Sequence, residues 1–337
     1  MTLPYWIRLS LLALLVSMAS LARPITSAKQ QALKVQSRIE QHLYTLPLEQ
    51  QGEYALMLYR TTGNKVYLNT ARVSLNLSAD RLQKLASHMA CKVDKQALLL
   101  EGALPIKPEL LDRYLDYFFY GGQVVPELLR ISQFGMILKG VLRENINRGV
   151  SGVDFKRAFT SKILQQYYAP DMAKQVYALL SLGFGDYRQS FIKSFQSVYP
   201  DKKDNDLSLE QRRHKWLTMA HLILAASDQL QEPVNDPLLN WIPEYFQLRE
   251  STLLAEGDNV LLAKVGLSLL LTGNKQSELL DKIRIHMSKL PSSNAIGKPD
   301  LWCMLLLGWV DDYYPDPALY RIRKFKHKMP YVLEPAD

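Results

Sequence analysis

Residues 262–275 read LAKVGLSLLLTGNK, an apolar run that is closed by a Thr-Gly-Asn-Lys turn. The same ending closes an apolar run at residues 53–65, EYALMLYRTTGNK. A looser copy, YALLSLGFGD at residues 177–186, has its glycine displaced by one residue. Glycine adopts the left-handed conformation after a helix without a steric penalty, and Asn or Asp can then cap the next helix. Each stretch therefore predicts two antiparallel helices joined by a short turn.

The rest of the chain has the same helical period. Apolar residues recur at three- and four-residue spacing in residues 30–46, which predicts a helix with one buried stripe. Similar stripes, bounded by Gly, Pro, Asn or Asp, cover 53–62, 66–90, 108–120, 124–147, 153–168, 171–182, 187–198, 208–230, 237–248, 259–272, 276–290, 299–312 and 316–328. Strand-like alternation is almost absent, so the sequence predicts an all-α protein. One hairpin cannot bury its apolar face alone, so neighbouring hairpins must stack.

This repetition of helix, Thr-Gly-Asn turn and helix resembles the α/α-toroid. That architecture is shared by six-hairpin glycosidases, polysaccharide lyases, sugar epimerases and lanthionine cyclases. The resemblance implies one helical-repeat domain over residues 23–337, closed into a ring. An open superhelix of hairpins has the same local pattern and is the alternative. No catalytic motif of an enzyme family accompanies the pattern, so the fold alone does not indicate a function.

The first 22 residues predict an export signal. Arg8 precedes a nearly unbroken apolar stretch over residues 9–22, which ends in the small-residue pattern Ser20-Leu21-Ala22. The stretch is shorter than the ~20 residues that a spanning helix needs, which favours a cleaved signal peptide over a membrane anchor. We therefore expect a periplasmic or secreted protein. No second long apolar run follows, which excludes a multi-span membrane protein.

The chain has two cysteines, Cys91 and Cys303. Export to an oxidising compartment permits a disulfide between them, and the alternative is two separate buried cysteines. Trp302-Cys303 is similar to a Trp-Cys pair of the lanthionine cyclases. Their zinc site also needs a Cys followed by His, whereas Cys91 is followed by Lys92. The sequence therefore predicts neither a metal site nor a cofactor.

The formal net charge is +8, and part of it is concentrated near the C-terminus. Five cations fall within eight residues there: Arg321, Arg323, Lys324, Lys326 and Lys328. Such a run can bind an anionic surface or polymer, and in an exported protein nucleic acid is not the expected partner. The alternative is the solvated face of a last helix.

Residues 111–122, LDRYLDYFFYGG, contain the first candidate site. On an α-helix, Asp112, Asp116 and Tyr120 align at four-residue spacing on one face. Tyrosine rings stack on sugars, and a carboxylate binds hydroxyls or acts as an acid or base. We therefore consider Asp116 as a catalytic candidate and Tyr117 and Tyr120 as ligand-binding candidates. The alternative is an aromatic-rich core helix whose acids pair with a neighbouring cation.

The same stretch resembles the motif of the lipase-specific foldases, Arg-x-x-Phe-Asp-Tyr-Phe-Leu-Ser-Ala-x-Gly-Glu. Arg113, Asp116, Tyr117 and Phe118 match it, whereas Leu115 replaces the first Phe and the residues after Phe118 depart from it. The resemblance implies a secretion chaperone in which Arg113 and Asp116 help to shape a client-binding domain.

A second aromatic and acidic cluster contains Trp302, Asp311 and Asp312. The adjacent acids are further catalytic candidates, with Trp302 as a stacking platform for a sugar. The alternative is that the acids lie at a helix exit before the Pro-rich turn that follows them.

No Gly-rich phosphate loop, His-Glu-x-x-His or Gly-x-Ser-x-Gly motif occurs in the chain, which argues against the enzyme classes that use them. The sequence favours an exported helical-repeat protein that binds a protein or an envelope glycan on its concave face. A glycan-active hydrolase or lyase is the main alternative, and a foldase-like chaperone is the third.

Overall fold

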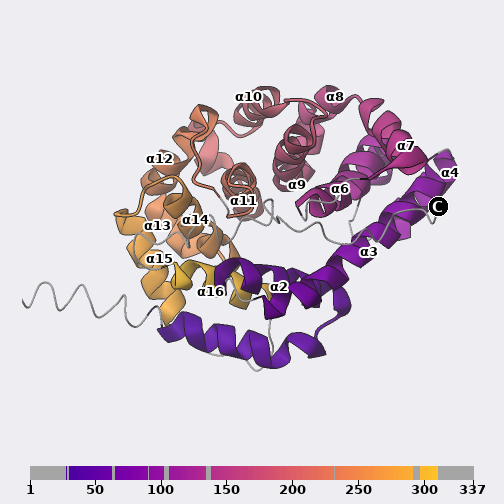
Figure 1. Ribbon diagram of the computed structural model, residues 1–337. Coiled ribbons are helices and arrows are strands. Elements are labelled where there is room, and N and C mark those ends of the chain that lie inside the picture. Colours follow the sequence, from indigo (N-terminus) through magenta and orange to yellow (C-terminus); the bar gives the residue numbers. More distant parts are fainter. Residues whose placement is uncertain are drawn as a thin grey trace, which may run out of the picture.

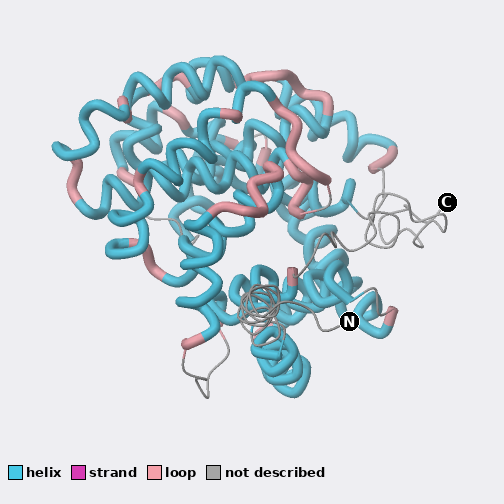
Figure 2. Tube along the Cα trace, turned by 90° about the vertical axis from the view of Figure 1, so that its left-hand side faces the viewer, coloured by secondary structure: helices cyan, strands magenta, loops and turns pink. Residues whose placement is uncertain are grey.

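The computed structural model describes residues 28–309, apart from residues 29, 63–64, 90, 102–105, 134–137, 231 and 291–296. All regular secondary structure in this part of the chain is helical, as Figures 1 and 2 show. The all-α prediction is confirmed. Within the same residues, no helix combines the length and the apolar character that a membrane span requires.

A first helix covers residues 30–42. The elements that follow are η1 (Leu43–Thr45), α2 (Leu48–Thr62), α3 (Val66–His88), α4 (Lys92–Glu101), α5 (Pro108–Arg113), η2 (Tyr117–Val124), α6 (Val125–Gln133), α7 (Gly140–Ser151), α8 (Phe155–Phe159), α9 (Lys162–Leu182), α10 (Arg188–Val198), η3 (Asp201–Asp206), α11 (Leu209–Ala226), η4 (Pro237–Leu239), α12 (Trp241–Leu248), α13 (Glu250–Glu256), α14 (Asn259–Leu271), α15 (Glu278–Ser288) and α16 (Lys298–Gly308).

Two of the glycine turns have the predicted geometry. Gly183 after α9 and Gly273 after α14 both have φ of 79°. The amide of the next residue donates back into the helix in each case, from Phe184 to Leu179 O at 2.9 Å and from Asn274 to Leu269 O at 2.8 Å. These are Schellman motifs, which satisfy carbonyls that the end of a helix leaves unpaired. The turn at residues 63–64 lies outside the described residues.

Contacts between helices follow a circuit. They pass from α2 to α3, α6, α9, α11, α14 and α16, and α16 contacts α2 again. In Figure 1 the yellow α16 accordingly lies beside the indigo α2, although the two are at opposite ends of the described chain. The remaining long helices, such as α7, α10 and α15, pack on the members of this circuit.

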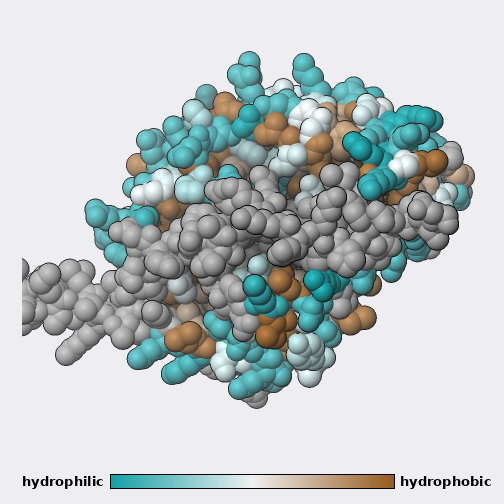
Figure 3. Space-filling model, viewed as in Figure 1, coloured by the Kyte–Doolittle hydropathy of each residue, from teal (hydrophilic) through white to brown (hydrophobic). Residues whose placement is uncertain are grey.

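The circuit helices α9 and α11 run in the same direction. In the α9/α11 pair, His214 contacts the carbonyl of Gln165, and further along both helices His221 contacts the carbonyl of Pro170. The helix α10 between them returns the chain along the outside, as the hairpin pattern predicts. Polar residues accordingly gather along the outer edge of the face in Figure 3, and the core of Leu, Ile, Phe and Tyr residues is continuous.

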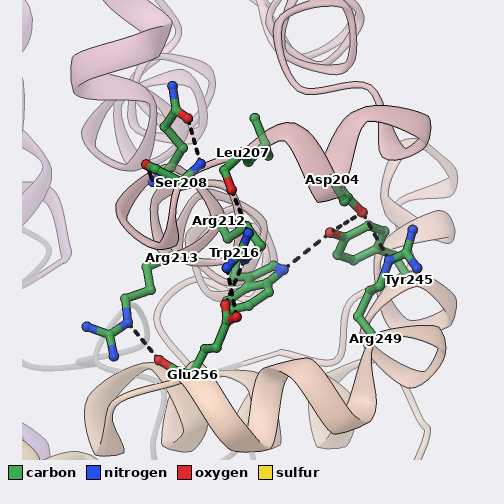
Figure 4. Close-up of polar contacts among 10 residues, drawn as sticks. Asp204, Leu207, Ser208, Arg212, Arg213, Trp216, Tyr245, Arg249 and Glu256 are labelled. Atoms are coloured by element: carbon green, nitrogen blue, oxygen red, sulfur yellow. Dashed lines mark hydrogen bonds and ion pairs between the residues drawn. The ribbon is translucent and has the colours of Figure 1, made fainter.

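A buried polar network joins α11 to the outer segments η3, α12 and α13 (Figure 4). Arg212 forms two hydrogen bonds with the Glu256 carboxylate, both at 2.7 Å. The Trp216 indole donates to the Tyr245 hydroxyl at 3.2 Å, and this hydroxyl donates to Asp204 at 2.9 Å. These bonds fix the outer layer against α11, whose side chains contribute to two cavities.

Several predicted helix boundaries were wrong. Residues 124–147 are interrupted between α6 and α7, and residues 153–168 by the break between α8 and α9. The helix α9 instead continues through Pro170, where the sequence predicted a boundary. The helices α4 and α13 were not predicted. The predicted helix over residues 316–328 lies outside the described residues.

Candidate functional site

A cavity of about 460 Å³ lies between α2, α6, α9 and the C-terminal end of α11, and we call it the α6–α9 cavity. Apolar lining comes from residues such as Val125, Pro126, Leu129 and Ala178. Its charged and amide-bearing lining residues are Glu53, Arg130, Asp171, Lys174, Gln175, Asp228 and Gln229. Its volume lies within the range of about 300–1,000 Å³ that is typical of small-molecule sites.

Three segments with irregular backbone border this cavity. The first is η2, a π-helix of eight residues, Tyr117–Val124. Gly122, on this segment, lines the cavity. π-Helical turns are rare and are frequently found at functional sites, because the extra residue in the turn has to be stabilised by its surroundings. Here Tyr117 supplies part of that support, since its buried hydroxyl donates to Gln175 Oε1 on α9 at 2.7 Å.

The second irregularity is Pro170 inside α9, directly before the lining residue Asp171. Proline has no N–H, so the carbonyl of Gln166 loses its helical partner. The hydroxyl of Tyr199 replaces that partner and donates to Gln166 O at 3.3 Å. The carbonyl of Pro170 in turn contacts His221 Nδ1 at 2.8 Å, so α9 is held by two other helical segments at this point.

The third irregularity follows α11. Asp228, Gln229 and Leu230 have φ of 52°, 57° and 74°, a run of three residues in the left-handed region. The amide of Gln229 donates to Leu224 O at 3.0 Å, so Asp228 takes the place that glycine has after α9 and α14. Left-handed backbone costs a non-glycine residue about 1–2 kcal/mol. Asp228 and Gln229 line the α6–α9 cavity, so this strained backbone borders the cavity.

Hydrogen bonds fix the Tyr177 side chain at the edge of the cavity. Its hydroxyl donates to Asp236 Oδ2 at 2.8 Å, and Arg188 Nη1 donates to the same oxygen at 2.9 Å. Burial is the main cause that raises the pKa of Tyr177, followed by the hydrogen bond to Asp236. The neighbouring Arg188 holds the pKa of the Asp186 carboxyl below its usual value. Tyr177 is therefore a neutral, immobilised ring.

Two further cavities are lined by none of the residues of these three irregular segments. One of about 370 Å³ is lined by Arg143 and Ser132 between α6 and α7, and we call it the α6–α7 cavity. Another of about 520 Å³ is lined by Arg213, His214 and Lys264 between α11 and α14. Within the described residues, no group of three or more His, Cys, Asp or Glu side chains is placed to hold a metal ion.

The family model that is described as "Domain of unknown function (DUF3541)" matches residues 28–336. The chain belongs to the DUF3541 family. No match is found among curated proteins or among solved structures. The description of the DUF3541 family assigns no activity.

In this DUF3541 protein, the predicted acidic and aromatic face on residues 111–122 is not formed. Asp116 is exposed and pairs with Lys95 at 2.8 Å, whereas Tyr117 and Tyr120 are buried. The prediction assumed an α-helix, but η2 begins at Tyr117, and its wider turn moves Tyr120 out of line with Asp116. Arg113 is exposed, with its guanidinium carbon 5.3 Å from the ring centre of Tyr114.

Tyr120 packs into the core. A Cβ atom added to Gly149 on α7 would lie within 2.4–2.7 Å of the Tyr120 ring, so this glycine admits the ring. Trp302 is half-buried on α16, and its ring lies 4.8 Å from Lys264 Nζ. None of the described candidates Arg113, Asp116, Tyr117, Tyr120 or Trp302 belongs to the described lining of the α6–α9 cavity.

The disulfide between Cys91 and Cys303 is not formed. Both cysteines are free, Cys91 exposed and Cys303 buried. Burial raises the pKa of the Cys303 thiol to about 11, which keeps it protonated. The predicted export signal, Asp311, Asp312 and the basic run Arg321–Lys328 lie outside the described residues.

The residues that the sequence analysis missed are mainly the cavity's charged residues, Glu53, Arg130, Lys174 and Asp228. They come from the helices α2, α6 and α9 and from the turn after α11, and no local pattern joins them. Two local signals were visible, the Gly121-Gly122 pair and the Pro170-Asp171 pair. Each marks a helix that departs from regular geometry where it borders the cavity.

Proposed function

We propose that this protein binds part of a glycan in the α6–α9 cavity. The observation that carries the proposal is the convergence of three unusual backbone segments on one cavity. These are η2, the proline turn of α9 and the left-handed run after α11. Strained or irregular backbone persists where the surroundings hold it, and it concentrates at binding and active sites.

The lining suits a ligand that is rich in hydroxyl groups. Carboxylates and amides accept hydrogen bonds from hydroxyls, and Asp171, Gln175 and Gln229 supply such groups. The side chains of Pro126 and Leu129 offer apolar surface for the C–H faces of a sugar. A cavity of about 460 Å³ accommodates a few sugar units, whereas a protein partner needs an interface of about 800 Å² per side. The geometry therefore favours a glycan over a protein.

The proposal includes the shape and the location of the protein. The circuit of contacts from α2 to α16 supports a closed α/α-toroid with the cavity among its inner helices. The apolar stretch over residues 9–22 supports export, which gives access to glycans of the cell envelope.

A glycan array with a cavity-filling variant tests this function. Ser181 is exposed and lines the cavity, so Ser181→Trp should obstruct the site without disturbing the core. Ser132→Trp is the matched control, because Ser132 is exposed and lines the α6–α7 cavity. We expect the wild type and Ser132→Trp to bind the same glycans and Ser181→Trp to lose them. Binding that survives in Ser181→Trp would exclude this cavity as the site.

A glycan-cleaving enzyme is the second candidate. Glu53, Asp171 and Asp228 line the same cavity, and most glycosidases use a pair of carboxylates as catalytic residues. Incubation with the glycans that bind, followed by detection of new reducing ends or of unsaturated products, distinguishes an enzyme from a binding protein. Turnover that is lost in Asp171→Asn but kept in Asp116→Asn, whose carboxylate lies outside the cavity, would establish the enzyme.

A further inference from the structure

Arg130 on α6 is held at one end of its guanidinium group. Its Nη1 atom donates to Glu127 Oε2 and to Ser78 Oγ, both at 3.2 Å. These bonds use both N–H groups of Nη1, whereas Nε and Nη2 have no recorded partner among the residues that the structure describes. Arg130 lines the α6–α9 cavity, and its side chain is 37% exposed. A fixed guanidinium with three unused donors is therefore available at the cavity wall.

Arg130 shares the Glu127 carboxylate with a second guanidinium group. The buried Glu127 carboxylate also accepts a hydrogen bond from Arg81 Nη1 at 3.1 Å. Because the bonds to Glu127 and Ser78 already order its side chain, Arg130 can hold an anionic group of a ligand through its other N–H groups at little further cost in side-chain ordering.

A second cation comes from the neighbouring helix α9. Lys174 lines the same cavity, its side chain is 48% exposed, and its ammonium group lies 2.6 Å from Asp171. The helices α6 and α9 pack against each other, so the two cations belong to adjacent walls. A planar guanidinium fork and a point charge suit a carboxylate or a phosphate, whose oxygens accept several hydrogen bonds at once.

The acids of the cavity limit the charge of the ligand. Glu53, Asp171 and Asp228 line it together with Arg130 and Lys174, so the cavity as a whole is not positive. These carboxylates would repel a polyanion. A hydroxyl-rich ligand with one anionic group can instead pair that group with a cation, while its hydroxyls donate hydrogen bonds to the carboxylates. We propose that the α6–α9 cavity binds a saccharide through a single anionic group, a carboxylate or a phosphate, between Arg130 and Lys174. This inference rests on the proposed glycan-binding function.

Matched sets of oligosaccharides test the inference. Each set has a neutral, a uronate-bearing and a 6-phosphorylated form of one backbone, and binding is measured for the full mature chain. For at least one backbone, we expect one anionic form to bind about tenfold or more tightly than the neutral form. The preferred form identifies the anion. Arg130→Gln should lower binding of the anionic form to that of the neutral form, and Lys174→Gln should reduce the preference in part.

Arg143→Gln is the control, because Arg143 is exposed and lines the α6–α7 cavity. It should keep the preference of the wild type. Thermal unfolding of each variant shows whether it folds, and Arg130→Lys, which keeps the charge but loses the fork, provides a second variant at the same position. Equal binding of neutral and anionic forms, or a preference that survives Arg130→Gln, would overturn the inference. If Ser181→Trp still blocked binding in that case, the glycan-binding function would stand without it. If Ser181→Trp blocked no glycan, both would fall.

Discussion

At the scale of single residues, Gln229 tests whether the cavity is maintained at a cost in stability. Its φ of 57° is unfavourable for a side chain with a Cβ atom. We expect Gln229→Gly to raise the free energy of unfolding by about 1 kcal/mol, because glycine adopts this conformation without strain. The same change should weaken binding in the α6–α9 cavity, since Gln229 is part of its lining. Urea denaturation and glycan titration measure the two effects.

Gly273→Ala is the matched control for Gln229→Gly, because it makes the opposite change at another position with positive φ. Gly273 has φ of 79° and open space around an added Cβ atom, so alanine there should lower stability by about 1 kcal/mol through backbone strain alone. Opposite signs for the two changes are expected. A loss of stability in Gln229→Gly would mean that side-chain contacts outweigh the strain.

His221 makes stability depend on pH. Its pKa lies well below the usual value of 6.5, because of burial first and of Lys264 and Lys174 next. Its Nδ1 contacts Pro170 O and its Nε2 contacts Lys264 Nζ, both at 2.8 Å, so the neutral ring donates from Nδ1 and accepts at Nε2. The unfolded chain binds a proton below about pH 6.5 while the folded chain does not, so stability should fall as the pH drops below 6.5.

The loss from His221 is up to about 1.4 kcal/mol per pH unit between 6.5 and the folded-state pKa. His214, whose pKa burial also lowers, adds to the fall. Urea denaturation at pH 7.5 and 5.5 should show a smaller difference in His221→Gln than in the wild type. The exposed His286 offers the control His286→Gln, which should leave the difference unchanged. An equal difference in all three proteins would contradict the assignment.

At the scale of elements, the sequence predicts helices well where apolar residues recur at regular helical spacing and a local turn ends the helix. Leu111, Leu115, Phe118 and Phe119 are buried as the period requires, and Gly183 ends α9 as its turn predicts. The predicted helix boundary was wrong at Pro170, where a hydrogen-bond donor from a distant part of the sequence replaces the N–H that proline lacks. The helix α9 continues through Pro170 because Tyr199 donates to Gln166 O, and nothing in the sequence near Pro170 indicates that partner.

The candidate site was less predictable than the fold for a related reason. The period of 3.6 residues places Asp116 and Tyr120 on one face, but η2 inserts a wider turn whose cost is met by packing against α7, α8 and α9. Lining residues such as Glu53 and Lys174 are far apart in the sequence and are ordinary surface residues in their own helices. Only the stacking of the helices brings them to one cavity.

The attachment of η3 to α11 depends on a buried ion pair. Lys215 is fully buried, and its Nζ lies 2.7 Å from Asp204 and 2.7 Å from Asp201. We expect Lys215→Met to lower the free energy of unfolding by about 3 kcal/mol, because the buried Asp204 loses one of its two cationic partners and keeps Arg249 at 3.0 Å. Asp201→Asn should cost no more than about 1 kcal/mol, since Asp201 is 58% exposed. Urea denaturation compares the two, and equal losses would contradict the difference in burial.

At the scale of the whole molecule, the position of the site depends on how the helices are joined. The α6–α9 cavity is bounded by α2 from the start of the described chain and by α9 and α11 from its middle. Glu53 reaches this cavity because α2 is held between α3 and α16. The contact between the first helix and α16, which includes the ion pair of Arg38 with Asp300, therefore also fixes one wall of the site.

An engineered disulfide tests whether the helices close into a ring. A Cβ atom on Gly308 at the end of α16 would lie 3.8 Å from the Cβ of Ala32 on the first helix. This is about the mean Cβ separation of natural disulfides, ~3.8 Å. In a Cys91→Ser background, Ala32→Cys with Gly308→Cys should therefore oxidise without strain, while the buried Cys303 stays reduced.

The crosslink would span residues 32 to 308 and so restrict nearly the whole unfolded chain. The chain-entropy model then gives a stabilisation of about 5–6 kcal/mol, which thermal unfolding with and without reductant measures. Thiol counting by mass after alkylation shows whether the bridge forms, and Ala32→Cys alone is the control for the new thiol. In an open superhelix the two positions lie far apart, so a variant that stays fully reduced under oxidising conditions would reject the closed ring and the position of Glu53 in the cavity with it.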